Sequence, residues 1–93
     1  MLLQVQMTER TVKTQYPACN PERQFSHAER LRASGDNTGL RALTRGARLA
    51  GICISLQQGP AVFAVGRGKG EGIISVRSKG SFQSFFTSEM AFE

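Results

Sequence analysis

Capping residues, more than the spacing of apolar residues, predict a first helix over residues 21 to 34. Asn20 is placed to cap its start, and Pro21 suits the first helical position because no backbone partner is needed there. Gly35 supplies the left-handed residue that commonly ends a helix. At about 100° per residue the apolar face is narrow, and it consists of Phe25, Ala28 and Leu31.

A second helix is predicted over residues 39 to 50, after a turn at 36–39. Gly51 is expected to end it. Its apolar residues fall within about 80° of one another, which is typical of a helix with one buried side. They are Leu40, Leu43, Ala47 and Ala50.

From residue 52 onward apolar and polar residues alternate, which predicts strands rather than helices. The clearest strand places Ile52, Ile54 and Leu56 on one side. A turn at 58–60 follows it, and the remaining strands of an antiparallel meander are expected at 61–65, 73–77 and 82–87. The spacing of apolar residues at 82–90 also fits one face of a helix, and a strand is favoured there.

Together these elements predict a single α+β domain over residues 1–93. Two helices pack on one face of a three- or four-stranded antiparallel sheet, with 21–50 helical and 52–87 forming the meander. Residues 1–20 are either weakly ordered or an extra N-terminal edge strand. Of the Leu, Ile, Val and Phe residues, fourteen lie in 49–93 and only five in 8–48, so the second half should supply most of the core.

The eighteen uncharged residues at 49–66 approach the length of a membrane-spanning helix. The run Gln57-Gln58-Gly59-Pro60 in their middle favours a turn between two strands, so we expect no membrane association. The first seven residues lack the basic start of a signal peptide, which predicts a cytoplasmic location. Cys19 and Cys53 are then expected to be unpaired.

Basic residues gather at two places in the sequence. The chain has 12 Lys and Arg against 7 Asp and Glu, and nine of the twelve are Arg, which favours an anionic partner. Arg41, Arg45 and Arg48 recur along one side of the second helix, away from its leucines. Such a row suits a phosphate backbone, and a solvated polar face is the alternative.

The second basic place is the loop 66–72, which has glycine at every second position and carries Arg67 and Lys69. Its backbone is free to wrap around a ligand, although a flexible hairpin loop is the alternative. The spacing does not match a P-loop or a dinucleotide fingerprint.

Residue types that carry catalysis are sparse in the chain. His27 is the only histidine, the two cysteines lack the paired spacing of a zinc site, and no carboxylates stand out as an acid and base pair. We therefore predict a protein that is not an enzyme, with no cofactor, no metal and no evident small-molecule substrate.

The leading hypothesis is nucleic-acid binding, RNA or single strands above duplexes, through five basic residues: Arg41, Arg45, Arg48, Arg67 and Lys69. The alternative is a protein-interaction module or inhibitor that docks on an acidic partner through an edge strand or through Phe82, Phe85 and Phe86. Core filling competes with that use of the phenylalanines. A third hypothesis is a subunit of a larger assembly with RNA.

Overall fold

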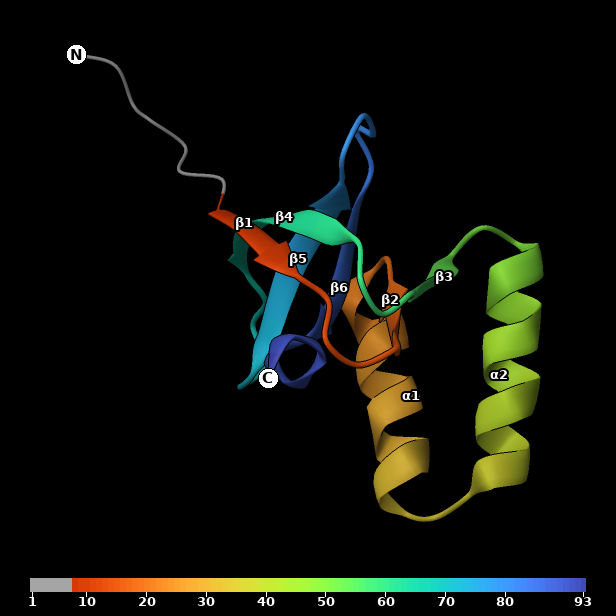
Figure 1. The fold of residues 1–93 in the computed structure, drawn as a ribbon. Coiled ribbons are helices and arrows are strands. Elements are labelled where there is room, and N and C mark those ends of the chain that lie inside the picture. The colour runs from red at the N-terminus through yellow and green to blue at the C-terminus, as the bar shows by residue number, and fades with distance from the viewer. Residues whose placement is uncertain (1–7) are drawn as a thin grey trace.

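The computed structural model describes residues 8–93, which form an α+β fold (Figure 1). The predicted fold class is therefore confirmed. The helices are α1 (Glu22–Ala33) and α2 (Asn37–Leu49), and a short 3₁₀ helix, η1 (Glu89–Phe92), follows the last strand. The strands are β1 (Thr8–Thr11), β2 (Tyr16–Cys19), β3 (Cys53–Leu56), β4 (Ala61–Arg67), β5 (Ile73–Ser78) and β6 (Ser84–Ser88). Of residues 1–20, which were predicted to be weakly ordered or an edge strand, 8–11 form the edge strand β1, and 1–7 lie outside the described residues.

Six strands of the described chain form one antiparallel sheet, where three or four were predicted. Their order is β1-β4-β5-β6-β2-β3. The meander prediction holds for β4, β5 and β6, which pair consecutively. It is wrong for β3, which does not pair with β4 but lies at the opposite edge beside β2.

β3 and β4 do not pair with each other because both belong to one side of a long, bent two-stranded ribbon, whose other side is formed by β1 and β2. β1 pairs with β4 up to Thr11↔Ala61, and β2 pairs with β3 from Tyr16↔Leu56, so four residues separate the two ladders on each strand. Across this gap Val12 N–H donates to the Pro60 carbonyl at 3.1 Å. The predicted turn at 58–60 is therefore a bend, and the β5–β6 hairpin fills the space between the two halves of the ribbon.

Both helices begin at positions that differ from the prediction. Asn20 does not cap α1: its side-chain amide donates to the Ser84 carbonyl at 3.0 Å, and the helix begins at Glu22 after a cis Asn20–Pro21 bond. α2 begins at Asn37, two residues early, because the Asp36 carboxylate accepts a hydrogen bond from Gly39 N–H at 2.8 Å.

The predicted helix ends are confirmed by two glycines in the left-handed region. Gly35 has φ +78° after α1, and Gly51 has φ +73° after α2. Both helices were predicted to pack on one face of the sheet, but their packing differs. α1 contacts β2 and β6, whereas α2 contacts α1 and the edge strand β3 (Figure 1).

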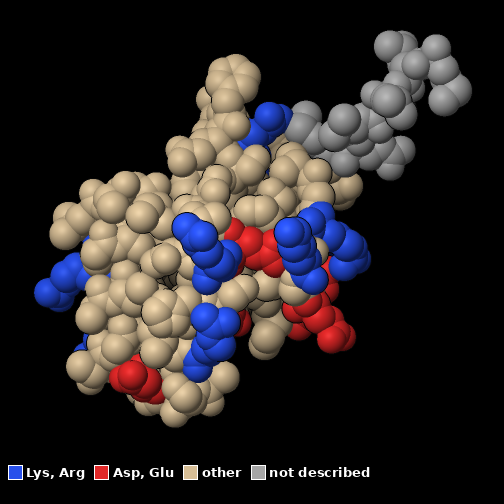
Figure 2. Space-filling model, turned by 180° about the vertical axis from the view of Figure 1, so that it is seen from behind, with Lys and Arg blue, Asp and Glu red and all other residues tan. Residues whose placement is uncertain are grey.

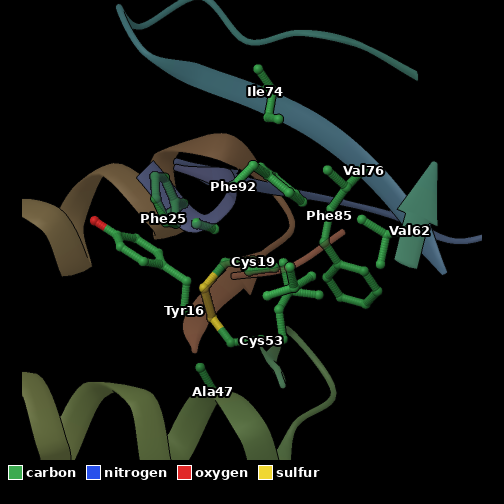
Figure 3. Close-up of a cluster of buried hydrophobic side chains, with 14 residues drawn as sticks. Tyr16, Cys19, Phe25, Ala47, Cys53, Val62, Ile74, Val76, Phe85 and Phe92 are labelled. Atoms are coloured by element: carbon green, nitrogen blue, oxygen red, sulfur yellow. A yellow bond between two sulfur atoms is a disulfide. The ribbon is translucent and has the colours of Figure 1, made fainter. Parts of the chain in front are cut away.

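The core lies between the curled sheet, α1 and η1, and the disulfide Cys19–Cys53 runs through it (Figure 3). Cys19 and Cys53 stand directly opposite each other on β2 and β3, so their side chains leave the sheet on the same side. The expectation of unpaired cysteines is therefore wrong. The sequence did not indicate this pair because its two residues lie 34 positions apart and only the register of β2 with β3 brings them together. A buried disulfide is typical of proteins from oxidising compartments, and the cytoplasmic location stays a prediction.

The uncharged run at 49–66 covers the end of α2, then β3 and most of β4. No helix within residues 8–93 has both the length and the apolar composition needed to cross a membrane.

Candidate functional site

The arginine row of α2 lies on its exposed side. Arg41, Arg45 and Arg48 are all exposed, while Ala47 on the opposite side is 5 % exposed and packs into the core. Within residues 8–93, none of the three guanidinium groups forms an ion pair. The row therefore presents three uncompensated positive charges along one helix.

A groove of about 300 Å³ runs between α2 and the strands β2 and β3. Arg41 and Arg48 of α2 line it, and so does Arg32 of α1. The Arg32 guanidinium lies 4.4 Å from the centre of the Tyr16 ring, and its other contact is Glu29 at 3.8 Å. Arg32 was not predicted as a site residue, because only the pairing of α1 with α2 brings it to the row.

The groove also carries hydrogen-bonding side chains. Gln15 Nε2 donates to Ser55 Oγ at 3.0 Å across the β2–β3 edge, and Thr44 lines the helix side. The Thr44 hydroxyl bonds to the Leu40 carbonyl at 2.8 Å. The groove thus combines cationic side chains with neutral polar groups that can donate or accept hydrogen bonds.

Arg67 and Lys69 lie apart from the arginine row. Their loop is on the far side of the sheet from α2, with α1 between them (Figure 1). Arg67 Nη1 is 3.3 Å from Glu89 Oε1, so an internal carboxylate already faces its charge. The structure therefore does not bring the five predicted basic residues together on one face.

The glycine loop 66–72 wraps around a carboxylate of the same chain. The Lys69 N–H donates to Glu22 Oε1 at 2.9 Å, and the Gly70 N–H donates to Glu22 Oε2 at 2.8 Å. These two backbone hydrogen bonds lower the pKa of the Glu22 carboxyl below its ordinary value. The loop therefore encloses an internal carboxylate, and its use in binding a ligand stays a prediction.

A second groove, about 690 Å³ in volume, opens beside this loop and is lined by Arg23, Arg30 and Lys69 as well as Glu22. On the back of the molecule, basic and acidic side chains lie next to each other in the middle of the face (Figure 2). This surface differs from the arginine row in having acidic groups among its basic ones.

Phe82, Phe85 and Phe86, which were predicted as a docking surface, do not form one exposed surface. Phe85 is 6 % exposed and belongs to the core, and Phe86 is partly buried against it. Phe82 is 96 % exposed because it lies in the turn between β5 and β6, two residues before β6 begins. The strand predicted at 82–87 is thus displaced to 84–88, and of the three phenylalanines only Phe82 is fully exposed.

The only histidine of the chain, His27, is exposed on α1. In the described part of the chain, no three His, Cys, Asp or Glu side chains gather where they could hold a metal ion. Comparison with protein-family models, with curated proteins and with solved structures found no match for this chain.

Proposed function

We propose that this protein binds nucleic acid, single strands and RNA above duplexes, through the arginine row of α2 and the groove beside it. The observation that carries the proposal is the row itself: three exposed guanidinium groups without an acidic partner among the described residues. Because α2 contains no Asp or Glu, it holds three of the five excess positive charges of the chain.

A solvated polar face explains this helix less well than a bound anion does. Like charges at i and i+4, as in Arg41 and Arg45, destabilise a helix by about 0.2–0.5 kcal/mol. Gly46 in the helix interior costs up to about 1 kcal/mol relative to alanine. Leu49 is 86 % exposed, so α2 gains little from burial. A phosphate chain on the row would offset the repulsion.

The dimensions of the row fit a short stretch of backbone. From Arg41 to Arg48 the helix rises about 10 Å, which matches about three phosphates of a strand that rises about 3.4 Å per nucleotide. Tyr16 is 5 % exposed and covered by Arg32, so it offers no stacking surface. Contacts to phosphate should dominate, and sequence preference should be weak.

The groove favours single strands because only an unpaired nucleotide can turn a base or ribose into it. Gln15, Thr44 and Ser55 line it with amide and hydroxyl groups. In a duplex the base edges are already paired, and the groove would stay empty.

The test is fluorescence anisotropy of a labelled oligouridine at several salt concentrations. About three phosphate contacts predict an affinity loss of about 2 log units per tenfold rise in salt. The variant R41E/R45E/R48E should lose at least hundredfold in affinity, while R41K/R45K/R48K, which keeps the charge, should bind within a few-fold of the wild type. Absence of binding at low salt, or wild-type affinity of the glutamate variant, would overturn the proposal.

A protein partner is the second candidate, and the exposure of Phe82 is the observation that favours it. Phe82 is 96 % exposed in the turn of the β5–β6 hairpin, and β1 forms an outer edge of the sheet, at the left in Figure 1. An acidic protein held through Phe82 should be retained in a pull-down after nuclease treatment and lost with F82S. Retention that disappears with nuclease alone would instead favour nucleic acid, or assembly into a larger complex with RNA.

A further inference from the structure

The glycine loop between β4 and β5 is shaped by its own main chain. Gly68 N–H donates to the Ile73 carbonyl at 2.8 Å, and Ile73 N–H donates back to the Gly70 carbonyl at 3.3 Å. At its end, the Gly72 carbonyl accepts from Glu89 N–H at 2.8 Å. These bonds do not involve Glu22, so the loop should keep its shape when that side chain leaves.

Two N–H groups of this loop point at one anion. The donors are Lys69 and Gly70, and the acceptors are the two oxygens of the Glu22 carboxylate. The glycines permit this approach, because a Cβ on Gly68 would lie 2.8 Å from a Glu22 oxygen, and a Cβ on Gly70 would lie 2.6 Å from the Ile73 side chain. Successive N–H groups that converge on an oxyanion form the concavity that commonly binds phosphate.

The surroundings of this carboxylate are more basic than one carboxylate requires. The adjacent groove is lined by Arg23, Arg30 and Lys69, and none of these side chains forms an ion pair within residues 8–93. Glu22 neutralises one charge and leaves the rest to solvent. A phosphate group carries more charge and more acceptor oxygens than a carboxylate.

We propose that the loop 66–72 is a receptor for a phosphate group, and that Glu22 occupies it as a tethered competitor in the free protein. An incoming phosphate accepts the two N–H bonds from Lys69 and Gly70, and Arg23 and Arg30 flank it. The Glu22 carboxylate then turns out to solvent. Because Glu22 is tethered, it competes at an effective concentration in the millimolar range or above, and the wild-type protein should bind phosphate weakly.

The test is titration with inorganic phosphate, followed by the amide NMR signals of Lys69 and Gly70. The variant E22A empties the receptor and should bind at least tenfold more tightly than the wild type. E71A is the matched control, since it removes one negative charge from the same loop and leaves the two N–H bonds to Glu22 intact. It should bind like the wild type.

Two results would overturn the proposal: no saturable shift of these amides in E22A, or the same gain in affinity for E22A and E71A, which would show a general charge effect. If E22A disturbs the loop, E22Q tests the same point, because its amide cannot accept both N–H bonds. The variant R41E/R45E/R48E should bind phosphate like the wild type here, so failure of nucleic-acid binding on α2 and failure of this site are distinguishable.

The source of the phosphate group is identified by competition. A 5′-phosphorylated dinucleotide that displaces inorganic phosphate points to nucleic-acid ends. Failure of that dinucleotide, with saturable binding of inorganic phosphate, restricts the site to free phosphate. Both results support the receptor, and they differ only in the ligand.

Discussion

Removal of the Cys19–Cys53 disulfide should lower the free energy of unfolding by about 4 kcal/mol. The bond joins β2 to β3 and closes a loop of 34 sequence positions that contains both helices. Restricting the unfolded chain over that length removes about 13 cal/mol/K of entropy in the loop-closure model, which corresponds to about 4 kcal/mol at 25 °C. A chain of 93 residues has a total stability of about 5–14 kcal/mol, so the bond supplies a large share of it.

The assay is urea unfolding of the wild type and of C19A/C53A, followed by circular dichroism. With an m-value of about 1.3 kcal/mol/M, the midpoint should fall by about 3 M. Thermal unfolding should show a decrease of roughly 16–30 °C in Tm. Cys19 is 0 % and Cys53 4 % exposed, so the alanines also leave a small gap that adds to the loss.

Reduced wild-type protein provides the control that separates the bond from the side chains. It should lie within about 1 kcal/mol of C19A/C53A, because both lack the cross-link and differ only by two buried sulfur atoms. A difference below about 1 kcal/mol between oxidised and reduced protein would refute the loop-closure reasoning. Titration of two free thiols in the unfolded, unreduced protein would refute the bond itself.

Three further predictions follow from burial and hydrogen bonding. F25A should cost about 3–5 kcal/mol in urea unfolding because Phe25 is 0 % exposed, whereas F82S, at a residue 96 % exposed, should stay within about 0.5 kcal/mol; similar losses for both would refute the core described here. Because the pKa of the Glu22 carboxyl is lowered, its carboxylate stabilises the fold above its ordinary pKa of 4.5, and this contribution is lost as pH falls through the lower pKa of the folded state. The difference in unfolding free energy between wild type and E22Q should therefore shrink in acid. A difference that stays constant with pH would contradict this role of Glu22. Tyr16 is the only tyrosine, and burial raises its pKa above 10.0, so ultraviolet absorbance should show ionisation at a higher pH in the folded protein than in the unfolded chain. Identical titrations of the two states would contradict its burial.

Elements with local signals could be predicted from the sequence. Both helices end at a glycine with positive φ, Gly35 and Gly51. A glycine at this place is a signal that the local sequence contains without reference to distant residues. The β4–β5–β6 meander joins neighbours in sequence, and short connections leave few other pairings. The arginine row depends only on helical periodicity and was predicted with its residues.

β2 could not be predicted, because its stability comes from distant partners. Its sequence, Tyr16-Pro17-Ala18-Cys19, contains a proline that cannot donate to a neighbouring strand. The structure accommodates it because β2 and β6 are paired only at Cys19↔Phe86, and Thr87 Oγ1 donates to the Pro17 carbonyl at 2.9 Å. The disulfide partner follows from the same register with β3, so neither was visible locally.

A basic residue is available to a partner only if no acidic residue of the same chain folds against it. Helical periodicity does not indicate where those acidic residues will lie. The stretch 37–70 contains no Asp or Glu, so any ion pair of its cations must come from elsewhere in the chain. The loop 66–72 lies beside α1 and β6, and Glu22 and Glu89 contact it. α2 instead lies against the acid-free strand β3 and against α1, whose Glu29 already accepts from the Tyr16 hydroxyl at 3.1 Å and lies 3.8 Å from Arg32. The row on α2 therefore keeps its charge because of its place at the sheet edge as much as because of its sequence. A mutation that places a carboxylate on β3, such as S55E, should weaken nucleic-acid binding although every arginine is unchanged. Unchanged affinity in the anisotropy assay would place the binding surface elsewhere.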